Sequence, residues 1–262
     1  MNKFLCVLLL GLLSGCATPY IDRTYNSVSQ DSRVQYLILH YTAEDFPTSL
    51  KLLTEGTVSS HYLVNDNPPT IYRLVDESRR AYHAGVSYWK GAAQLNAASI
   101  GIEIVNLGFR DTPNGRVWID YPQAQMDQVI ALVKKVVKEH NIKPEHILGH
   151  SDIAPSRKTD PGPRFPWKQL ADAGLIPWPD AGKVALRQVF YEQQLPDVAW
   201  FQKKLDQHGF AVPRNGDLDK RTQETISVFQ MKYRNTRFDG VPDAETAALL
   251  DVLTAPVEVT KK

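Results

Sequence analysis

The hydrophobic and polar positions along the chain predict two buried strands and one long helix. Residues 33–40 are mainly aliphatic or β-branched and end in a histidine, which is typical of a buried strand. Residues 99–106 alternate, with three isoleucines on one face and Glu103 on the other, as expected of a second strand. Residues 122–140 carry apolar side chains three and four positions apart, which indicates an amphipathic helix.

Shorter segments between these elements complete the pattern. The further expected elements are a short helix over residues 47–56, strands over residues 60–65, 70–74 and 146–150, and a short helix over residues 167–173. Residues 66–69, Asp-Asn-Pro-Pro, form the turn between two of these strands. We therefore predict an α/β domain over residues 33–176, with a mixed central sheet flanked by helices.

The carboxyl-terminal part of the chain has a different organisation. A Pro- and Gly-containing stretch at residues 177–183 has the composition of a linker. Helix-like runs then follow at residues 198–208, 220–233 and 244–253. The motif Gly-x-x-Asp-x-x-Thr occurs twice, and Asp219 and Asp243 are placed to cap the helices that follow them. These features predict a small all-α, three-helix domain over residues 184–254.

The amino terminus has the features of an export signal. Lys3 precedes an apolar run that is too short to span a bilayer. The run ends in Leu-Ser-Gly-Cys, which resembles the lipobox of bacterial lipoproteins, so residues 1–15 are expected to be removed and Cys16 to carry lipid. An ordinary secretory signal is the alternative. Ala17 follows the cysteine where an aspartate would suggest retention in the inner membrane. The resemblance therefore implies that the protein is anchored at the periplasmic face of the outer membrane in a Gram-negative cell, with residues 16–32 as a tether.

Composition and charge exclude some classes of protein. The chain has 30 Lys and Arg against 29 Asp and Glu, so it offers no general attraction for nucleic acid. Its only cysteines are Cys6 and Cys16, which leaves no free thiol and no disulfide in a lipidated mature chain. An exported enzyme of this kind needs a nucleophile other than cysteine.

Candidate metal ligands lie near the ends of the predicted strands. His40 ends the first strand, and His150 opens the stretch 149–163, which also contains Asp160. Three prolines fix the backbone φ within that stretch and Gly162 permits an unusual turn, so its polar side chains can be held without a helix beneath them. Two imidazoles, a carboxylate and an open fourth position form a catalytic zinc arrangement. Taken alone, the stretch also fits a polar surface turn.

Two further residues are candidates for proton transfer and charge stabilisation. Glu103 is a carboxylate in the middle of an apolar strand, and such a group is usually paired, near a metal or kept for proton transfer. Lys158 lies two residues before Asp160, so an extended backbone would turn both side chains to the same side.

Four blocks of sequence carry a resemblance to a known family. Residues 40–43, 99–103, 149–152 and 158–163 resemble the signature blocks of the zinc-dependent N-acetylmuramoyl-L-alanine amidases of the amidase_2 type. This family has a T7 lysozyme-like fold and includes the peptidoglycan recognition proteins. The tail, residues 184–254, resembles the three-helix peptidoglycan-binding domain.

The resemblance implies a role for each candidate residue. It places one Zn²⁺ per chain on His40, His150 and Asp160, with Glu103 as general base and Lys158 as electrophilic helper. It implies hydrolysis of the amide bond between N-acetylmuramic acid and L-alanine in peptidoglycan, for cell-wall turnover or recycling. The alternatives are a receptor that binds muropeptides without cutting them and an endopeptidase that cuts within the stem peptide.

The candidate substrate contacts are aromatic or basic residues near these blocks. They are His61, Tyr62, His83, Trp89 and Arg157. Each also has a structural interpretation, in core packing for the histidines and aromatic residues and in a solvated surface for the arginine. The expected partners are peptidoglycan fragments and the membrane, with no nucleic acid, and we expect a monomer.

Overall fold

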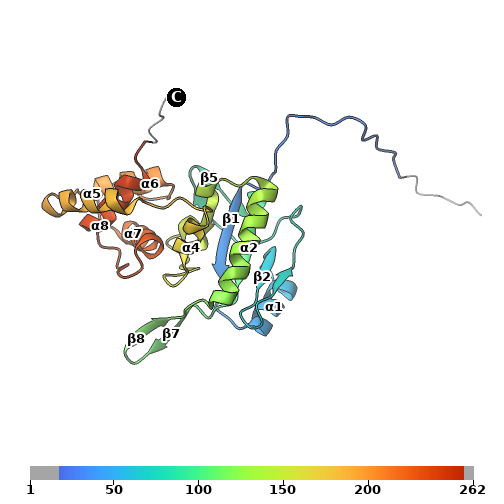
Figure 1. The fold of residues 1–262 in the computed structure, drawn as a ribbon, viewed down its shortest axis with the longest axis horizontal. Helices are drawn as coiled ribbons and strands as arrows, with labels where there is room; N and C mark the ends of the chain where they lie inside the picture. Colours follow the sequence, from blue (N-terminus) through green and yellow to red (C-terminus); the bar gives the residue numbers. More distant parts are fainter. Residues whose placement is uncertain (1–17, 257–262) are drawn as a thin grey trace, which may run out of the picture. The chain divides into compact units, whose positions relative to one another are not determined.

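The computed structural model describes residues 18–256 (Figure 1). Its contacts separate a unit ending at Asp31 from a unit that begins at Ser32. Residues 18–31 contain no helix or strand, and their side chains are exposed. No helix in the part of the chain that is described is long and apolar enough to cross a membrane. The predicted signal and lipid-bearing Cys16 lie outside the described residues, so both remain predictions.

A mixed five-stranded sheet organises the first part of the second unit (Figure 1). Its strand order is β3-β2-β6-β1-β9, with bounds β1 Tyr36–Tyr41, β2 Tyr62–Val64, β3 Ile71–Arg73, β6 Ser99–Ile104 and β9 Ile147–Gly149. Only β3 runs antiparallel to its neighbour. The central strands are short and almost wholly buried, as parallel strands require. The predicted fold class is confirmed.

The sheet is buried on both faces because each face meets its own apolar cluster. Helix α2, Gln123–His140, packs its buried stripe against Leu37, Leu39 and the isoleucines of β6. Ile38 and Leu148 point the other way, into a second cluster that also contains residues of the carboxyl-terminal helices. The alternation in β6 is thus confirmed, with its isoleucines in one core and Glu103 on the opposite face.

Short elements surround the sheet. They are α1 Phe46–Glu55, β4 Tyr88–Trp89, β5 Ala92–Ala93, η1 Leu95–Ala98, β7 Phe109–Thr112, β8 Gly115–Trp118, η2 Pro144–His146, α3 His150–Ile153 and α4 Trp167–Asp172. Asp45 caps α1 by accepting a hydrogen bond from the Thr48 N–H. The β7–β8 hairpin and the helical turn α3 were not predicted from the sequence.

The carboxyl-terminal part of the chain is all-α (Figure 1), with α5 Ala181–Gln193, α6 Val198–His208, α7 Lys220–Tyr233 and α8 Ala244–Leu253. The predicted caps are confirmed: Asp219 accepts from the Thr222 N–H and Asp243 from the Thr246 N–H. The predicted linker was too long, because Asp180 caps α5 and the helix begins at the next residue.

Candidate metal centre and active site

Parallel strands bring the candidate residues to one edge of the sheet. His40 on β1 and Glu103 on β6 are register partners. On the other side of β1, Leu39 pairs with Gly149 of β9, and His150 follows directly. Because carboxyl ends of parallel strands meet at the same edge, three chemically active side chains come together from distant positions in the sequence.

His40, His150 and Asp160 form a compact buried triad. The two Nδ1 atoms lie 3.0 Å apart, and the Asp160 Oδ2 atom lies 3.0 Å from His40 Nδ1 and 3.1 Å from His150 Nδ1. Ligand atoms at tetrahedral zinc, about 2.1 Å from the metal, are separated by about 3.4 Å. The spacing of the three donors therefore fits a small metal ion.

Hydrogen bonds behind the triad set which imidazole nitrogen faces its centre. The Nε2 atom of His150 lies 3.1 Å from the Ala84 carbonyl, which can only accept, so Nε2 carries the proton and the Nδ1 lone pair points inward. The Nε2 atom of His40 lies 3.1 Å from His83 Nδ1, and His83 Nε2 lies 3.3 Å from Ser99 Oγ. Such outer hydrogen bonds orient metal-binding histidines.

These contacts also test whether a metal fits the site. The Ser99 hydroxyl donates its only proton to the Leu95 carbonyl, so His83 Nε2 donates to Ser99 and His83 Nδ1 accepts from His40 Nε2. With the Nε2 atoms of His40 and His150 both protonated, two nitrogen lone pairs and a carboxylate oxygen converge with no proton between them. Such an arrangement is repulsive unless a cation lies between the three donors. The donor set of two imidazoles and one carboxylate is also one that zinc accepts.

Electrostatics favours the metal-binding forms of two triad residues, His40 and Asp160. Burial, reinforced by His150, lowers the pKa of His40 to about 4, so this ring is neutral at physiological pH. Burial acts to raise the pKa of Asp160, but the nearby imidazoles and their hydrogen bonds outweigh it and bring that pKa below its usual value. A neutral imidazole, as at His40, and an ionised carboxylate, as at Asp160, are forms that bind metal.

The stretch after His150 differs from the expectation of a loop with no helix beneath it. Residues His150–Ile153 form the helical turn α3, which begins where the Asp152 carboxylate accepts the Gly149 N–H at 2.8 Å. The Ser151 N–H donates to the Asp160 carbonyl at 2.8 Å, so both ends of the stretch are tied together. Gly162 has φ +79°, a conformation that glycine adopts at little cost, as predicted.

A cleft of about 200 Å³ opens beside the triad, and Glu103 and Lys158 line it with the three ligands. Glu103 Oε1 lies 4.0 Å from His40 Nδ1, and its buried Oε2 atom has no hydrogen-bond partner among residues 18–256. Burial and the nearby Asp160 carboxylate raise the pKa of Glu103 well above its usual value, against the opposing effect of Lys158. A carboxyl group with a raised pKa is suited to proton transfer.

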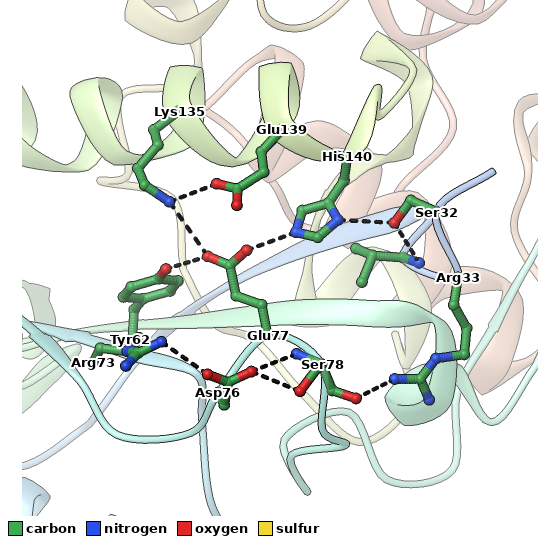
Figure 2. Close-up of a pocket in the computed structure, with 11 residues that line it drawn as sticks. Ser32, Arg33, Tyr62, Arg73, Asp76, Glu77, Ser78, Lys135, Glu139 and His140 are labelled. Carbon is green, nitrogen blue, oxygen red and sulfur yellow. Dashed lines mark hydrogen bonds and ion pairs between the residues drawn. The ribbon is translucent and has the colours of Figure 1, made fainter. Parts of the chain in front are cut away.

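A larger hollow, of about 820 Å³, is lined by other residues of the first part of the chain (Figure 2). Its central carboxylate, Glu77, accepts hydrogen bonds from Tyr62 and from His140, whose Nε2 lies 2.6 Å away, and Lys135 lies 3.6 Å from it. Because its central polar groups are paired with one another and none of the candidate catalytic residues lines it, we assign no chemistry to this hollow.

Four of the five candidate substrate contacts do not line the cleft, and the structure gives each of them another role. His61 is fully buried and accepts the Gly101 N–H, Tyr62 is buried and bonds Glu77, and Trp89 packs against Phe210. His83 lines the cleft but lies behind His40. The Arg157 guanidinium donates to the carbonyls of Ala84 and Val86, so this side chain supports the loop behind His150.

Other cleft residues were not selected from the sequence: Tyr41, Thr42, Ala43, Leu53, Val58, Ser59 and Tyr82. The first three directly follow His40, and this position beside a candidate ligand is the feature of the sequence that could have identified them. Tyr82 is 51% exposed, and its neighbour His83 was the only indication that it borders the site.

The fold and the site define an amidase, and the comparisons with known proteins agree. Residues 30–163 match the Amidase_2 model, N-acetylmuramoyl-L-alanine amidase, and residues 194–250 match the peptidoglycan-binding domain model PG_binding_1. The chain belongs to the N-acetylmuramoyl-L-alanine amidase family. It is an enzyme that hydrolyses the amide bond between N-acetylmuramic acid and L-alanine.

Individual relatives extend over nearly the whole chain. N-acetylmuramoyl-L-alanine amidase AmiD of Escherichia coli is 39% identical over 259 residues, which cover 92% of this chain and 93% of AmiD. The structure of AmiD with anhydro-N-acetylmuramic acid-L-Ala-D-γ-Glu-L-Lys matches with a TM-score of 0.81, over 89% of this chain and 93% of that one. AmpDh3 of Pseudomonas aeruginosa is 37% identical with a TM-score of 0.83, over 90% and 98% of the two chains.

Proposed function

We propose that this amidase is zinc-dependent, that it acts on muropeptides in the periplasm and that its lipidated Cys16 attaches it to the outer membrane. The observation that supports the metal most directly is the convergence of His40 Nδ1, His150 Nδ1 and Asp160 Oδ2 within about 3 Å of one another. Zinc at this triad would activate water and polarise the scissile carbonyl.

The residues around the triad have distinct proposed roles. Glu103 takes a proton from the attacking water, for which its raised pKa and its buried, unpaired Oε2 are suited. Lys158 stabilises negative charge on the carbonyl oxygen as the tetrahedral intermediate forms. Glu103 then returns the proton to the amine of L-alanine, which allows the carbon–nitrogen bond to break.

The proposed substrate is a muramic acid residue that carries a stem peptide. Solved relatives support this, since AmiD and AmpDh3 have been crystallised with anhydromuramic peptides. The match of residues 194–250 to a peptidoglycan-binding model supports attachment of the helical domain to the same polymer. We propose one catalytic unit per chain and a monomer.

Product analysis and metal analysis of the purified protein test this proposal together. We expect one zinc per chain, its loss in His40→Ala, and mass spectra that show intact stem peptides beginning with L-alanine. Fragments cut within the stem would support the endopeptidase alternative, and full activity without bound metal would contradict the zinc site.

A separate experiment tests the location. In cells, Cys16→Ser is expected to move the protein from the outer-membrane fraction to the soluble periplasm, because one lipidated cysteine is the only anchor proposed. Ser14→Ala, within the same predicted lipobox, serves as the control that keeps the cysteine. Outer-membrane attachment of Cys16→Ser would contradict lipid anchoring through Cys16.

A further inference from the structure

A buried carboxylate holds the backbone that carries the metal ligand His150. The Asp152 Oδ2 atom accepts the Gly149 N–H at 2.8 Å, and Gly149 immediately precedes the ligand. On the other side of His150, the Ser151 N–H donates to the carbonyl of the ligand Asp160 at 2.8 Å. The orientation of Asp152 therefore bears on two of the three metal ligands.

The partner of this carboxylate comes from the carboxyl-terminal helical domain. Lys232, near the end of α7, donates to the same Asp152 Oδ2 atom at 2.7 Å. The side chains of Lys232 and Asp152 are only 6% and 2% exposed, and Lys232 is the only cation within 4.0 Å of this carboxylate among residues 18–256. The Lys232 Nζ atom also lies 4.2 Å from the centre of the Trp167 ring, a favourable cation–π distance.

A gain in the free energy of unfolding does not by itself explain a buried ion pair between Lys232 and Asp152. Removing two charges from water costs several kcal/mol, and buried ion pairs often stabilise no more than an apolar pair of the same size. The distinctive effect of Lys232 is geometric, because it fixes the oxygen that receives the Gly149 N–H. Apolar contacts such as Trp89 with Phe210 already join the helices to the amidase domain.

We propose that Lys232 is a positioning residue for His150, so that the helical domain completes the metal site of the amidase domain. This inference rests on the metal site of the proposed function. Through Asp152, Lys232 holds α3 in the orientation in which His150 Nδ1 faces His40 and Asp160. It touches neither substrate nor metal.

The inference is tested by the zinc affinity of the full chain, which is measured by competition with a chromophoric chelator. We expect Lys232→Met to weaken zinc binding by about tenfold or more, the usual effect of losing an outer support of a ligand. The absorption bands of the Co²⁺-substituted protein should also change, since they report ligand geometry. Lys232→Arg, which keeps the charge, should recover part of the affinity.

Two controls separate positioning from general damage. Lys204→Met removes another lysine of the helical domain that pairs with an aspartate, Asp251, at 2.8 Å and lies near a tryptophan, and it should bind zinc like the wild type. Trp178→Leu weakens packing of the linker on Tyr233 and should leave the Co²⁺ spectrum unchanged. If Lys232→Met does not fold, Lys232→Gln gives the same comparison with a smaller expected loss.

Wild-type zinc affinity and an unchanged Co²⁺ spectrum in a folded Lys232 variant would overturn the inference. Equal losses in Lys232→Met and Trp178→Leu would also overturn it, because domain docking would then explain both. Absence of zinc binding in the wild type would instead contradict the proposed function, so the two failures are distinguishable.

Discussion

Glu103 and His40 are register partners on the adjacent parallel strands β6 and β1, and their side chains approach to 4.0 Å between Oε1 and Nδ1. The sheet itself therefore fixes the distance between the proposed general base and a proposed metal ligand. We expect Glu103→Gln to keep one zinc per chain, because the triad is intact, and to lower kcat by about 10²–10⁴-fold, the usual contribution of a general base.

Zinc stoichiometry and the rate of muropeptide hydrolysis, measured on the same sample, check this prediction. Glu55→Gln, at the exposed end of α1, is the matched control and should match the wild type in both. A Glu103→Gln enzyme with a normal rate would remove Glu103 from the mechanism.

Lys158 lines the cleft from the stretch that also carries Asp160. If it stabilises charge that develops only in the transition state, Lys158→Met should lower kcat by about 10²–10³-fold with little change in KM. Steady-state kinetics on a defined muropeptide measures both constants. Lys168→Met removes an exposed lysine of α4 and should have no effect. A change in KM alone would assign Lys158 to substrate binding.

Local patterns were sufficient to predict the strands of the five-stranded sheet and the positions of the candidate ligands. The short apolar run that ends in His40 indicates a buried strand with a polar group at its end. The isoleucine-rich run that contains Glu103 indicates a second strand with a carboxylate on one face. Parallel pairing then brings the ends together. The resemblance added the roles, and these remain predictions for the metal ligands as well as for Glu103 and Lys158.

Other features depend on tertiary contacts that local patterns do not reveal. Trp89 and Tyr62 are aromatic residues near the signature blocks, and only the packing shows that they face the core and a separate polar network. Helix α5 exposes several apolar side chains, such as Leu186, so its periodicity does not mark a buried face. The β7–β8 hairpin did have a local signal, the Asn114–Gly115 dipeptide typical of tight turns.

Glu77 gives a pH-dependent contribution to stability that is independent of the metal site (Figure 2). Burial acts to raise its pKa, but hydrogen bonds from Tyr62 and His140 outweigh this and lower it below the usual 4.5. A carboxyl group whose pKa is lowered by folding stabilises the protein above the unfolded-state pKa and loses that effect as pH falls. Glu77→Gln should therefore destabilise the protein at pH 7, by about 1–3 kcal/mol.

Urea unfolding at several pH values measures this difference. The gap between wild type and Glu77→Gln should narrow as pH falls through and below about 4.5, where the wild-type carboxyl becomes protonated. Glu139→Gln is the control, since its carboxylate lines the same hollow but is more exposed and, among residues 18–256, bonds only Lys135. If the difference in free energy of unfolding stays constant from pH 7 to pH 3, the ionised Glu77 carboxylate is not the source of the stabilisation.

Gly101 provides a test of the support behind His40, because its strand passes directly beneath the His83 ring. A Cβ atom at this position would lie 2.5 Å from His83 Cγ, and His83 is the residue that contacts His40 Nε2. Gly101→Ala should therefore destabilise the fold by about 1–3 kcal/mol through overpacking and weaken zinc binding by displacing His83.

A double-mutant cycle with His83→Ala isolates this clash. Once the ring is removed, the methyl group introduced by Gly101→Ala no longer meets an imidazole, so the double variant should be more stable than the sum of the two single losses predicts. The coupling should exceed about 0.5 kcal/mol in thermal or urea unfolding, which is above the error for independent sites. Strictly additive losses would show that the added methyl group disturbs the strand in another way and does not act through the His83 ring.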